Sequence, residues 1–187
     1  MLHFLRVATV SISFLFLCSC ATTSLSTYTD PAFADVTFDS VAIWADMGDL
    51  EWRQDLETRM QQRMATKTGA KATRVIDIAP PTRGYNVDEV FQLMRGVGIQ
   101  AVLVVAFTET GIKQTISGSG DGVQTYNKPW GEATVDLYHV ESGNKIWTGN
   151  ATTRGDAFTD WEEVRRSAGT KIIAGLLADG LLPPPSE

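Results

Sequence analysis

Three carboxylates that stand close together in the sequence could bind a metal ion. Asp46, Asp49 and Glu51 lie within one short stretch, and carboxylate oxygens are the ligands that a hard cation such as calcium prefers. The stretch does not match an EF-hand loop, and a segment with helical periodicity follows it. Because acidic side chains are favoured at a helix N-terminus, we interpret the three residues as a helix start. Asp121 lies in a glycine-rich segment, and we interpret it as a turn residue rather than a calcium ligand.

Histidine-based catalysis would have to depend on His139. A serine hydrolase could combine it with Asp136 and a serine, but the Gly-x-Ser-x-Gly motif that presents such a nucleophile is missing from the sequence. The chain has two histidines and two cysteines, too few for a metal site built from these ligands. We therefore expect His139 to be an ordinary residue at the end of a strand.

Nucleotide cofactors have one formal motif, GVGIQA at residues 96–101. A dinucleotide site needs such glycines between a strand and a following helix, so that the pyrophosphate meets the helix N-terminus. Here a helix is expected before the glycines and a strand after them. The phosphate-binding pattern Gly-x-x-x-x-Gly-Lys-Ser/Thr is also missing from the sequence. We expect no cofactor.

The net charge of the chain restricts the kinds of molecule that it could bind. The 187 residues include 16 lysines and arginines against 22 acids, a formal net charge of −6. An acidic chain is unsuited to nucleic acid, and its overall charge gives no attraction to anionic lipid. The length suits one domain.

The N-terminus predicts export. Residues 1–6 carry one positive side chain, and residues 7–17 are then entirely apolar or hydroxylic, which is typical of a secretory signal and too short for a membrane-spanning helix. Both cysteines, Cys18 and Cys20, follow at once. A disulfide between them would close an unfavourably small loop, and zinc would need further ligands.

The stretch Leu17-Cys18-Ser19-Cys20 resembles the lipobox of bacterial lipoproteins, which has an aliphatic residue three places before the modified cysteine and a small residue just before it. The resemblance implies cleavage after Ser19, a lipid on Cys20 and loss of Cys18. Lipoproteins of this class carry several acyl chains, enough for firm membrane binding. Ala21 rather than aspartate follows the lipidated cysteine, which in enteric-type bacteria implies the outer membrane, with the domain facing the periplasm.

Residues 1–19 are thus expected to be a signal peptide, residues 20–35 a lipidated tether rich in serine and threonine, and residues 36–187 a single domain. Hydrophobic periodicity and capping signals predict an α/β fold with the order β-α-β-α-β, then two β-hairpins, then a final helix. We expect one mixed sheet covered by helices. The expected elements are strands at residues 38–46, 72–79 and 100–107, helices at 48–69, 86–98 and 159–180, and hairpins at 111–130 and 133–153.

The first hairpin is expected to be long and to extend beyond the sheet, because SGSGDG at residues 117–122 is a turn signal between two β-forming segments. Tyr126, Lys128 and Trp130 lie beside this turn. Exposed aromatic residues often anchor partners, so we interpret these three residues as a partner contact. For Trp130 an alternative stays open, that it packs where the hairpin rejoins the sheet.

Residues 38–182 resemble periplasmic lipoprotein domains, such as the activators of penicillin-binding proteins and the curli secretion lipoprotein. The resemblance rests on the element order, on AVLVV after a glycine-ended helix, and on Gly143 and Trp147 before a late amphipathic helix. It implies envelope assembly or secretion support through contact with an envelope protein or a second copy of the chain, without catalysis. Two alternatives stay open: a glycan or peptidoglycan hydrolase that uses two carboxylates, and a carrier of a small ligand.

Overall fold

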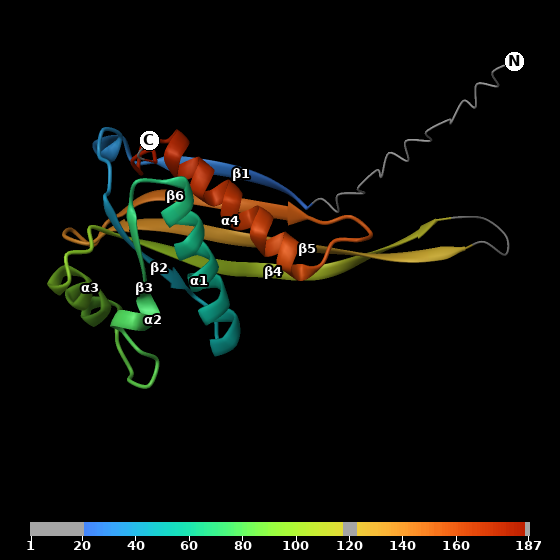
Figure 1. The fold of residues 1–187 in the computed structure, drawn as a ribbon, viewed down its shortest axis with the longest axis horizontal. Coiled ribbons are helices and arrows are strands. Elements are labelled where there is room, and N and C mark those ends of the chain that lie inside the picture. The colour runs from blue at the N-terminus through green and yellow to red at the C-terminus, as the bar shows by residue number, and fades with distance from the viewer. Residues whose placement is uncertain (1–20, 118–122, 186–187) are drawn as a thin grey trace, which may run out of the picture.

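The computed structural model describes residues 21–117 and 123–185. Within these ranges six strands form one mixed sheet in the order β1-β6-β5-β4-β2-β3 (Figure 1). The expected α/β class, with a single mixed sheet and helices packed on it, is confirmed. The elements are β1 (Thr22–Thr29), η1 (Pro31–Phe33), β2 (Ser40–Ala45), α1 (Leu50–Lys67), β3 (Lys71–Arg74), α2 (Val75–Ile78), α3 (Val87–Gly96), β4 (Ala101–Ser117), β5 (Gln124–His139), β6 (Lys145–Arg154) and α4 (Trp161–Ala178).

The parallel part of the sheet is built by the two helical crossovers. β2 pairs in parallel with β3 on one side and with β4 on the other. The start of β4 is buried on both faces, as a continuous apolar run predicts. β4, β5, β6 and β1 then pair in antiparallel order.

One face of the sheet is covered by α1 and α4, which pack side by side across it (Figure 1). The two helices approach closely at Gly169, where a Cβ atom would lie 2.8 Å from the Sδ of Met60. Arg63 of α1 donates to the carbonyl of Arg166 at 2.8 Å, and burial, followed by repulsion from Arg166 and Arg59, lowers the pKa of Arg63. The buried helix residues on this face are Leu56, Met60, Met64, Ile172, Ile173 and Leu176.

Trp52, Leu56, Met60 and Met64 recur every four residues, which predicts a buried stripe on α1, but the stripe is buried only in part. Leu56, Met60 and Met64 lie in the core, but Trp52 is 48% exposed. Its ring instead lies under the guanidinium of Arg165, 4.9 Å from the ring centroid. Trp52 is in the first turn of α1, where the helix has passed the end of the strands it covers, so helical spacing alone overestimated its burial.

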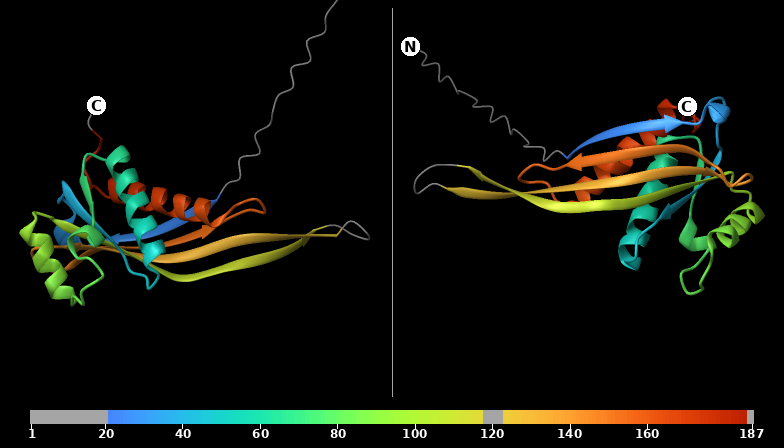
Figure 2. Two further views of the ribbon diagram at one scale, coloured as in Figure 1. Left: turned by 60° about the horizontal axis from the view of Figure 1, so that its bottom comes forward. Right: turned by 180° about the vertical axis from the view of Figure 1, so that it is seen from behind.

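The other face of the sheet is covered only at one end. There α2 and α3 pack on the start of β4, with Phe91 of α3 against the edge of Tyr138. Seen from behind, β1, β6 and β5 have no helix over them (Figure 2). The sheet is therefore buried on one side and largely open on the other.

Part of the segment expected to be a tether is a strand. Thr22–Thr29 forms the edge strand β1, which pairs over its whole length with β6. Its side chains explain the pairing. Leu25 packs on the main core, and the Oγ1 of Thr23 lies 2.8 Å from both the Thr153 and Ser167 hydroxyls. A serine- and threonine-rich sequence suits both a linker and an edge strand, and the partner strand decides between them.

Three local expectations also need correction. The strand expected at residues 72–79 ends at Arg74, and the short helix α2 replaces its second half. The first hairpin extends beyond the sheet as expected, but the strand expected at residues 100–107 is part of the same strand β4, with a register shift between Phe107 and Glu109. The spacing of Thr159 and Glu162 predicts a capping box for the last helix, but the cap is Asp160, which accepts from the Glu163 N–H.

No helix in the described part of the chain is long and apolar enough to span a bilayer.

Candidate functional site

The hairpin of β4 and β5 projects beyond the rest of the sheet, and we call residues 111–117 and 124–130 the ribbon (Figure 1). β2 pairs with β4 only as far as Val105, and β6 pairs with β5 only from Trp130 onward. Alternation along the strands gives the ribbon two different faces. Lys113 and Lys128 lie directly opposite each other on one face, while Ile112 and Ile116 lie on the other.

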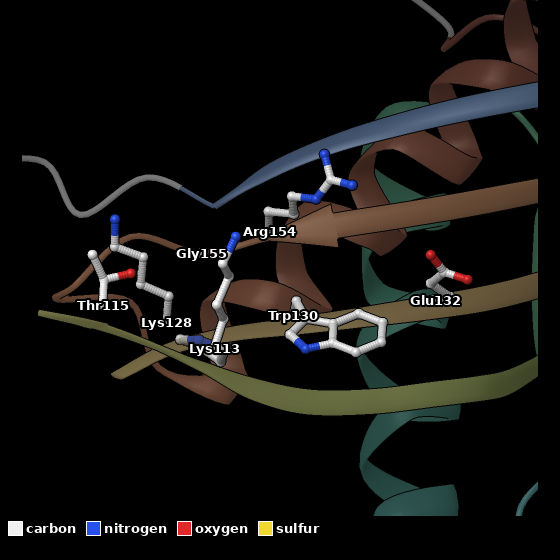
Figure 3. Close-up of a pocket in the computed structure, with 8 residues that line it drawn as sticks. Lys113, Thr115, Lys128, Trp130, Glu132, Arg154 and Gly155 are labelled. Carbon is white, nitrogen blue, oxygen red and sulfur yellow. The ribbon is translucent and has the colours of Figure 1, made fainter. Parts of the chain in front are cut away.

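A groove of about 690 Å³ lies at the base of the ribbon (Figure 3). Three cations line it together with an aromatic ring, a carboxylate and smaller groups. The lining residues are Lys113, Thr115, Lys128, Pro129, Trp130, Glu132, Arg154 and Gly155. They come from three strands, which the β4–β5 and β5–β6 pairings bring into register.

Trp130 is held by a glycine on the neighbouring strand. Its indole lies over Gly111, where a Cβ atom would be 2.8 Å from the Nε1 atom. Any side chain at position 111 would therefore displace the ring. The close approach keeps Trp130 half-buried at the boundary between sheet and ribbon.

Charges of the same sign lie opposite each other around Trp130, which destabilises the isolated chain. Lys113 faces Lys128 across the β4–β5 pair, and Glu109 faces Glu132 nearer the core. Like charges directly opposite each other destabilise a strand pair. In the described ranges no ion pair involves Lys113, Lys128 or Arg154. The groove thus holds three cations and one carboxylate, Glu132.

The uncovered face of the sheet continues from this groove over β5, β6 and β1 (Figure 2). We use "uncovered face" for the side of these strands opposite α1 and α4. It is dominated by hydroxyl and amide groups. Its residues, given by the strand registers, are Ser24, Ser26, Tyr28, Glu132, Thr134, Asp136, Thr148, Asn150 and Thr152.

Of the carboxylates considered for metal binding, Asp49 is the N-cap of α1 and accepts from the Trp52 N–H at 2.9 Å. Glu51 lies in the first turn of the same helix. This agrees with the interpretation as a helix start. Across the described residues, no three histidine, cysteine, aspartate or glutamate side chains converge in a way that could hold a metal ion.

His139 and Asp136 do not form a catalytic pair. The Nδ1 of His139 lies 3.0 Å from the Ser142 hydroxyl, and its ring packs near Phe33. Asp136 accepts from Thr148 at 2.6 Å and from Lys145 at 3.3 Å. The two residues thus have separate partners.

Of the glycines in residues 96–101, Gly96 is the last residue of α3, and Gly98 lies between α3 and the start of β4. Gly98 has φ +75°, a conformation that favours glycine after a helix. The order of helix before strand is therefore the one expected, and it is the reverse of a dinucleotide site. Cys18, Cys20 and Asp121 lie outside the described residues.

Some contributors to the site were not found from the sequence. Lys113 and Arg154 join Lys128 and Trp130 only because of cross-strand register. Their separation in the sequence gives no signal of this. Of the expected contact residues, Lys128 and Trp130 share the groove, while Tyr126 lies beside Phe158 with ring centroids 6.5 Å apart.

No protein-family model matches the chain, and no curated protein matches it. Among solved structures, the PelC dodecamer from Paraburkholderia phytofirmans is 18% identical and covers 83% of this chain and 97% of its own, with a TM-score of 0.56. Lipoprotein GNA1162 from Neisseria meningitidis is 16% identical and covers 75% of this chain and 98% of its own, with a TM-score of 0.45. The first likeness shows a shared fold.

Proposed function

We propose that this chain is a periplasmic domain anchored to the outer membrane by lipid on Cys20, and that it acts by binding protein in cell-envelope assembly or secretion support. The partner that the structure supports best is a second copy of the chain. The observation that carries this proposal is the edge strand β1. On its outer side, its backbone N–H and C=O groups pair with no other strand of the described sheet.

Edge strands of natural proteins are protected by charges, prolines, bulges or a covering segment. β1 has eight residues, TTSLSTYT, with no charge and no proline, and it pairs with β6 in an unbroken register. Such an edge is a template for another strand. A regular contact along this edge would take the place of the missing protection.

The uncovered face next to β1 suits a hydrated protein contact. It carries hydroxyl and amide groups that can form hydrogen bonds directly or through water. Tyr28, which is 64% exposed, lies at one end of this face. Trp130 lies at the other end, at the base of the ribbon. Aromatic residues at such positions are frequent anchors of protein interfaces.

The comparison with PelC is compatible with self-association, since that protein forms a dodecamer. Two different edges that meet head to tail generate a ring when the rotation closes. The edge strand β1 and, on the opposite side of the sheet, the length of β4 beyond Val105 that β2 does not reach are two such different edges.

Catalysis is not part of the proposal. Asp49 caps a helix, and Asp136 and His139 have structural partners. No observation favours the glycan hydrolase or the small-ligand carrier over a binding role.

The test is the mass in solution of residues 20–187 with Cys20→Ser, which removes lipid as a cause of association. Light scattering after size exclusion should give a defined multiple of the monomer mass. The double variant Ser24→Lys and Ser26→Lys places two charges on the edge strand and should give monomers. Gln92→Lys on the exposed side of α3 is the matched control and should leave the assembly intact.

A monomer at all concentrations, or an assembly that tolerates both edge lysines, would contradict self-association through β1. Circular dichroism of each variant establishes that the fold is retained.

A further inference from the structure

The proposed lipid attachment site is separated from the first strand by a single residue. Only Ala21 separates Cys20 from Thr22, the first residue of β1, and two extended residues span at most about 7 Å. The Ser167 hydroxyl of α4 donates to the Ala21 carbonyl at 3.1 Å, and it also lies 2.8 Å from the Thr23 hydroxyl. A lipid on Cys20 would therefore hold the start of β1 directly at the bilayer surface.

The start of β1 and the base of the ribbon lie at the same end of the sheet (Figure 1). Thr22 pairs with Arg154, Arg154 with Trp130, and Trp130 with Gly111. Beyond this level the ribbon continues for six residues, from Trp130 to Gln124, which is about 20 Å of strand. A domain anchored at Thr22 therefore brings its ribbon to the membrane as well.

This end of the molecule exposes apolar side chains that the core does not use. Phe158 and Ile116 are 73% and 71% exposed, the two highest values among the large hydrophobic residues described. Ile112 and Val123 are also more than half exposed. Tyr126 lies beside Phe158, and tyrosine is enriched where proteins meet the membrane interface.

The same end carries the three cations of the groove, which outnumber its one carboxylate, Glu132. Lys113 and Lys128 lie directly opposite each other, which destabilises the strand pair, and Arg154 follows on the next strand. An external anion would offset the repulsion between the two lysines.

We propose that the ribbon is a second membrane contact, in which its isoleucines and Phe158 enter the bilayer interface and the three cations bind the phosphates of anionic lipids. This rests on the proposed anchoring at Cys20. The flexible stems of the lysines allow their ammonium groups to reach the headgroups while the apolar side chains lie deeper. The local cations act although the whole chain is acidic, because charges beyond about a Debye length are screened.

Two membrane contacts restrict the orientation of the domain, whereas a single anchor does not. A lipid alone leaves the domain free to rotate about its attachment. With the ribbon also bound, the uncovered face and the β1 edge hold a constant direction relative to the membrane, which favours assembly of several copies in the membrane plane. Lys128 and Tyr126 are thereby assigned to lipid, and Trp130 stays with the protein surface.

The experiment uses residues 20–187 with Cys20→Ser, which retains every described strand and helix and carries no lipid. The protein is sedimented with vesicles of phosphatidylcholine alone, or of equal parts phosphatidylcholine and phosphatidylglycerol. We expect binding to the anionic vesicles, weakened by salt, and little binding to the neutral ones.

Two variants separate the contributions. Lys113→Gln with Lys128→Gln should weaken binding to anionic vesicles roughly thirtyfold, about fivefold for each lysine near an anionic surface. Ile112→Ser with Ile116→Ser should weaken it by roughly fivefold for each side chain that is half buried in the interface. The matched control is Lys67→Gln with Lys71→Gln, the same change of charge at the opposite end of the sheet, which should bind as the wild type does.

Equal binding by the wild type and both ribbon variants would overturn the proposal, as would equal binding to the two vesicle types. A loss of the same size in the Lys67 and Lys71 control would also overturn it, because binding would then follow overall charge. The result is independent of lipidation, which the fractionation of Cys20 variants tests separately.

Discussion

A buried carboxylate shows how single residues hold this fold together. Glu57 of α1 is fully buried, and one of its oxygens accepts from the Arg53 guanidinium at 3.0 Å and from the Ala45 N–H at 3.2 Å. The other oxygen accepts from the Ile76 N–H at 3.0 Å. Glu57 thereby joins α1 to the end of β2 and to the first turn of α2. A buried charge is tolerated only when it has such partners.

Replacing Glu57 with alanine should reduce the free energy of unfolding by about 3–5 kcal/mol, since it leaves a guanidinium and two backbone N–H groups without their acceptor. Glu57→Gln should cost less, because one oxygen acceptor remains. Urea unfolding measures both. The control Glu51→Gln, on the exposed side of the same helix, should change stability by less than about 0.5 kcal/mol. A loss for Glu57→Ala no larger than that of the control would contradict this role.

At the scale of elements, β1 and the ribbon are built from similar polar β-forming sequences but have different roles. β1 closes the edge of the sheet over buried groups, with Leu25 close to Trp147. The outer part of the ribbon has no core beneath it, and most of its side chains are exposed. Removing β1 should therefore lower stability, whereas shortening the ribbon should leave it nearly unchanged.

A chain that begins at Val36 lacks β1 and should be less stable than one that begins at Ala21. The loss of Leu25 alone corresponds to about 3 kcal/mol, which lowers the midpoint of thermal unfolding by roughly 10 °C in a domain of this size. Calorimetry of the two chains checks this. Identical midpoints would mean that residues 21–35 behave as a tether after all.

Shortening the ribbon should leave the fold intact. Replacing residues 116–125 with Asn-Gly keeps the pair Thr115–Tyr126 next to a favourable two-residue turn. We expect the thermal midpoint to change by no more than about 2 °C, because little apolar surface becomes exposed, while binding to anionic vesicles weakens. A protein that no longer folds would show that the ribbon is structural.

At the scale of the whole molecule, the anchor, the ribbon and the uncovered face define an orientation. The ribbon and the start of β1 point one way, and the short strand β3 and the C-terminal segment lie toward the other end (Figures 1 and 2). An orientation of this kind matters only if the protein is attached where the sequence places the lipid.

Cys20→Ala should release the protein from membranes or leave it unprocessed, because the sulfur that carries the acyl chains is gone. Cys18→Ala should change little, since that residue is expected to leave with the signal peptide. Membrane fractionation and labelling with a radioactive fatty acid distinguish these outcomes. Loss of labelling in the Cys18 variant would mean that the attachment site is assigned to the wrong cysteine.

Features that depend on neighbours along the chain follow from the sequence alone. The spacing of Asn86 and Glu89 predicts a capping box, and the structure has it. Leu56, Met60 and Met64 of α1 are buried as their spacing predicts, and the apolar run at the start of β4 is a central strand. These signals act within one or two helical turns or along one strand, so short windows of sequence contain them.

Contacts between distant segments do not follow from the sequence. Part of the expected tether pairs with β6 as β1, β3 ends at Arg74, and Trp52 is exposed. Lys113, Lys128 and Arg154 lie together beside Trp130. Strand pairing and register depend on groups far apart in the chain, and a shift by one residue would move each side chain to the opposite face. For that reason the site could be seen only once the sheet had been assembled.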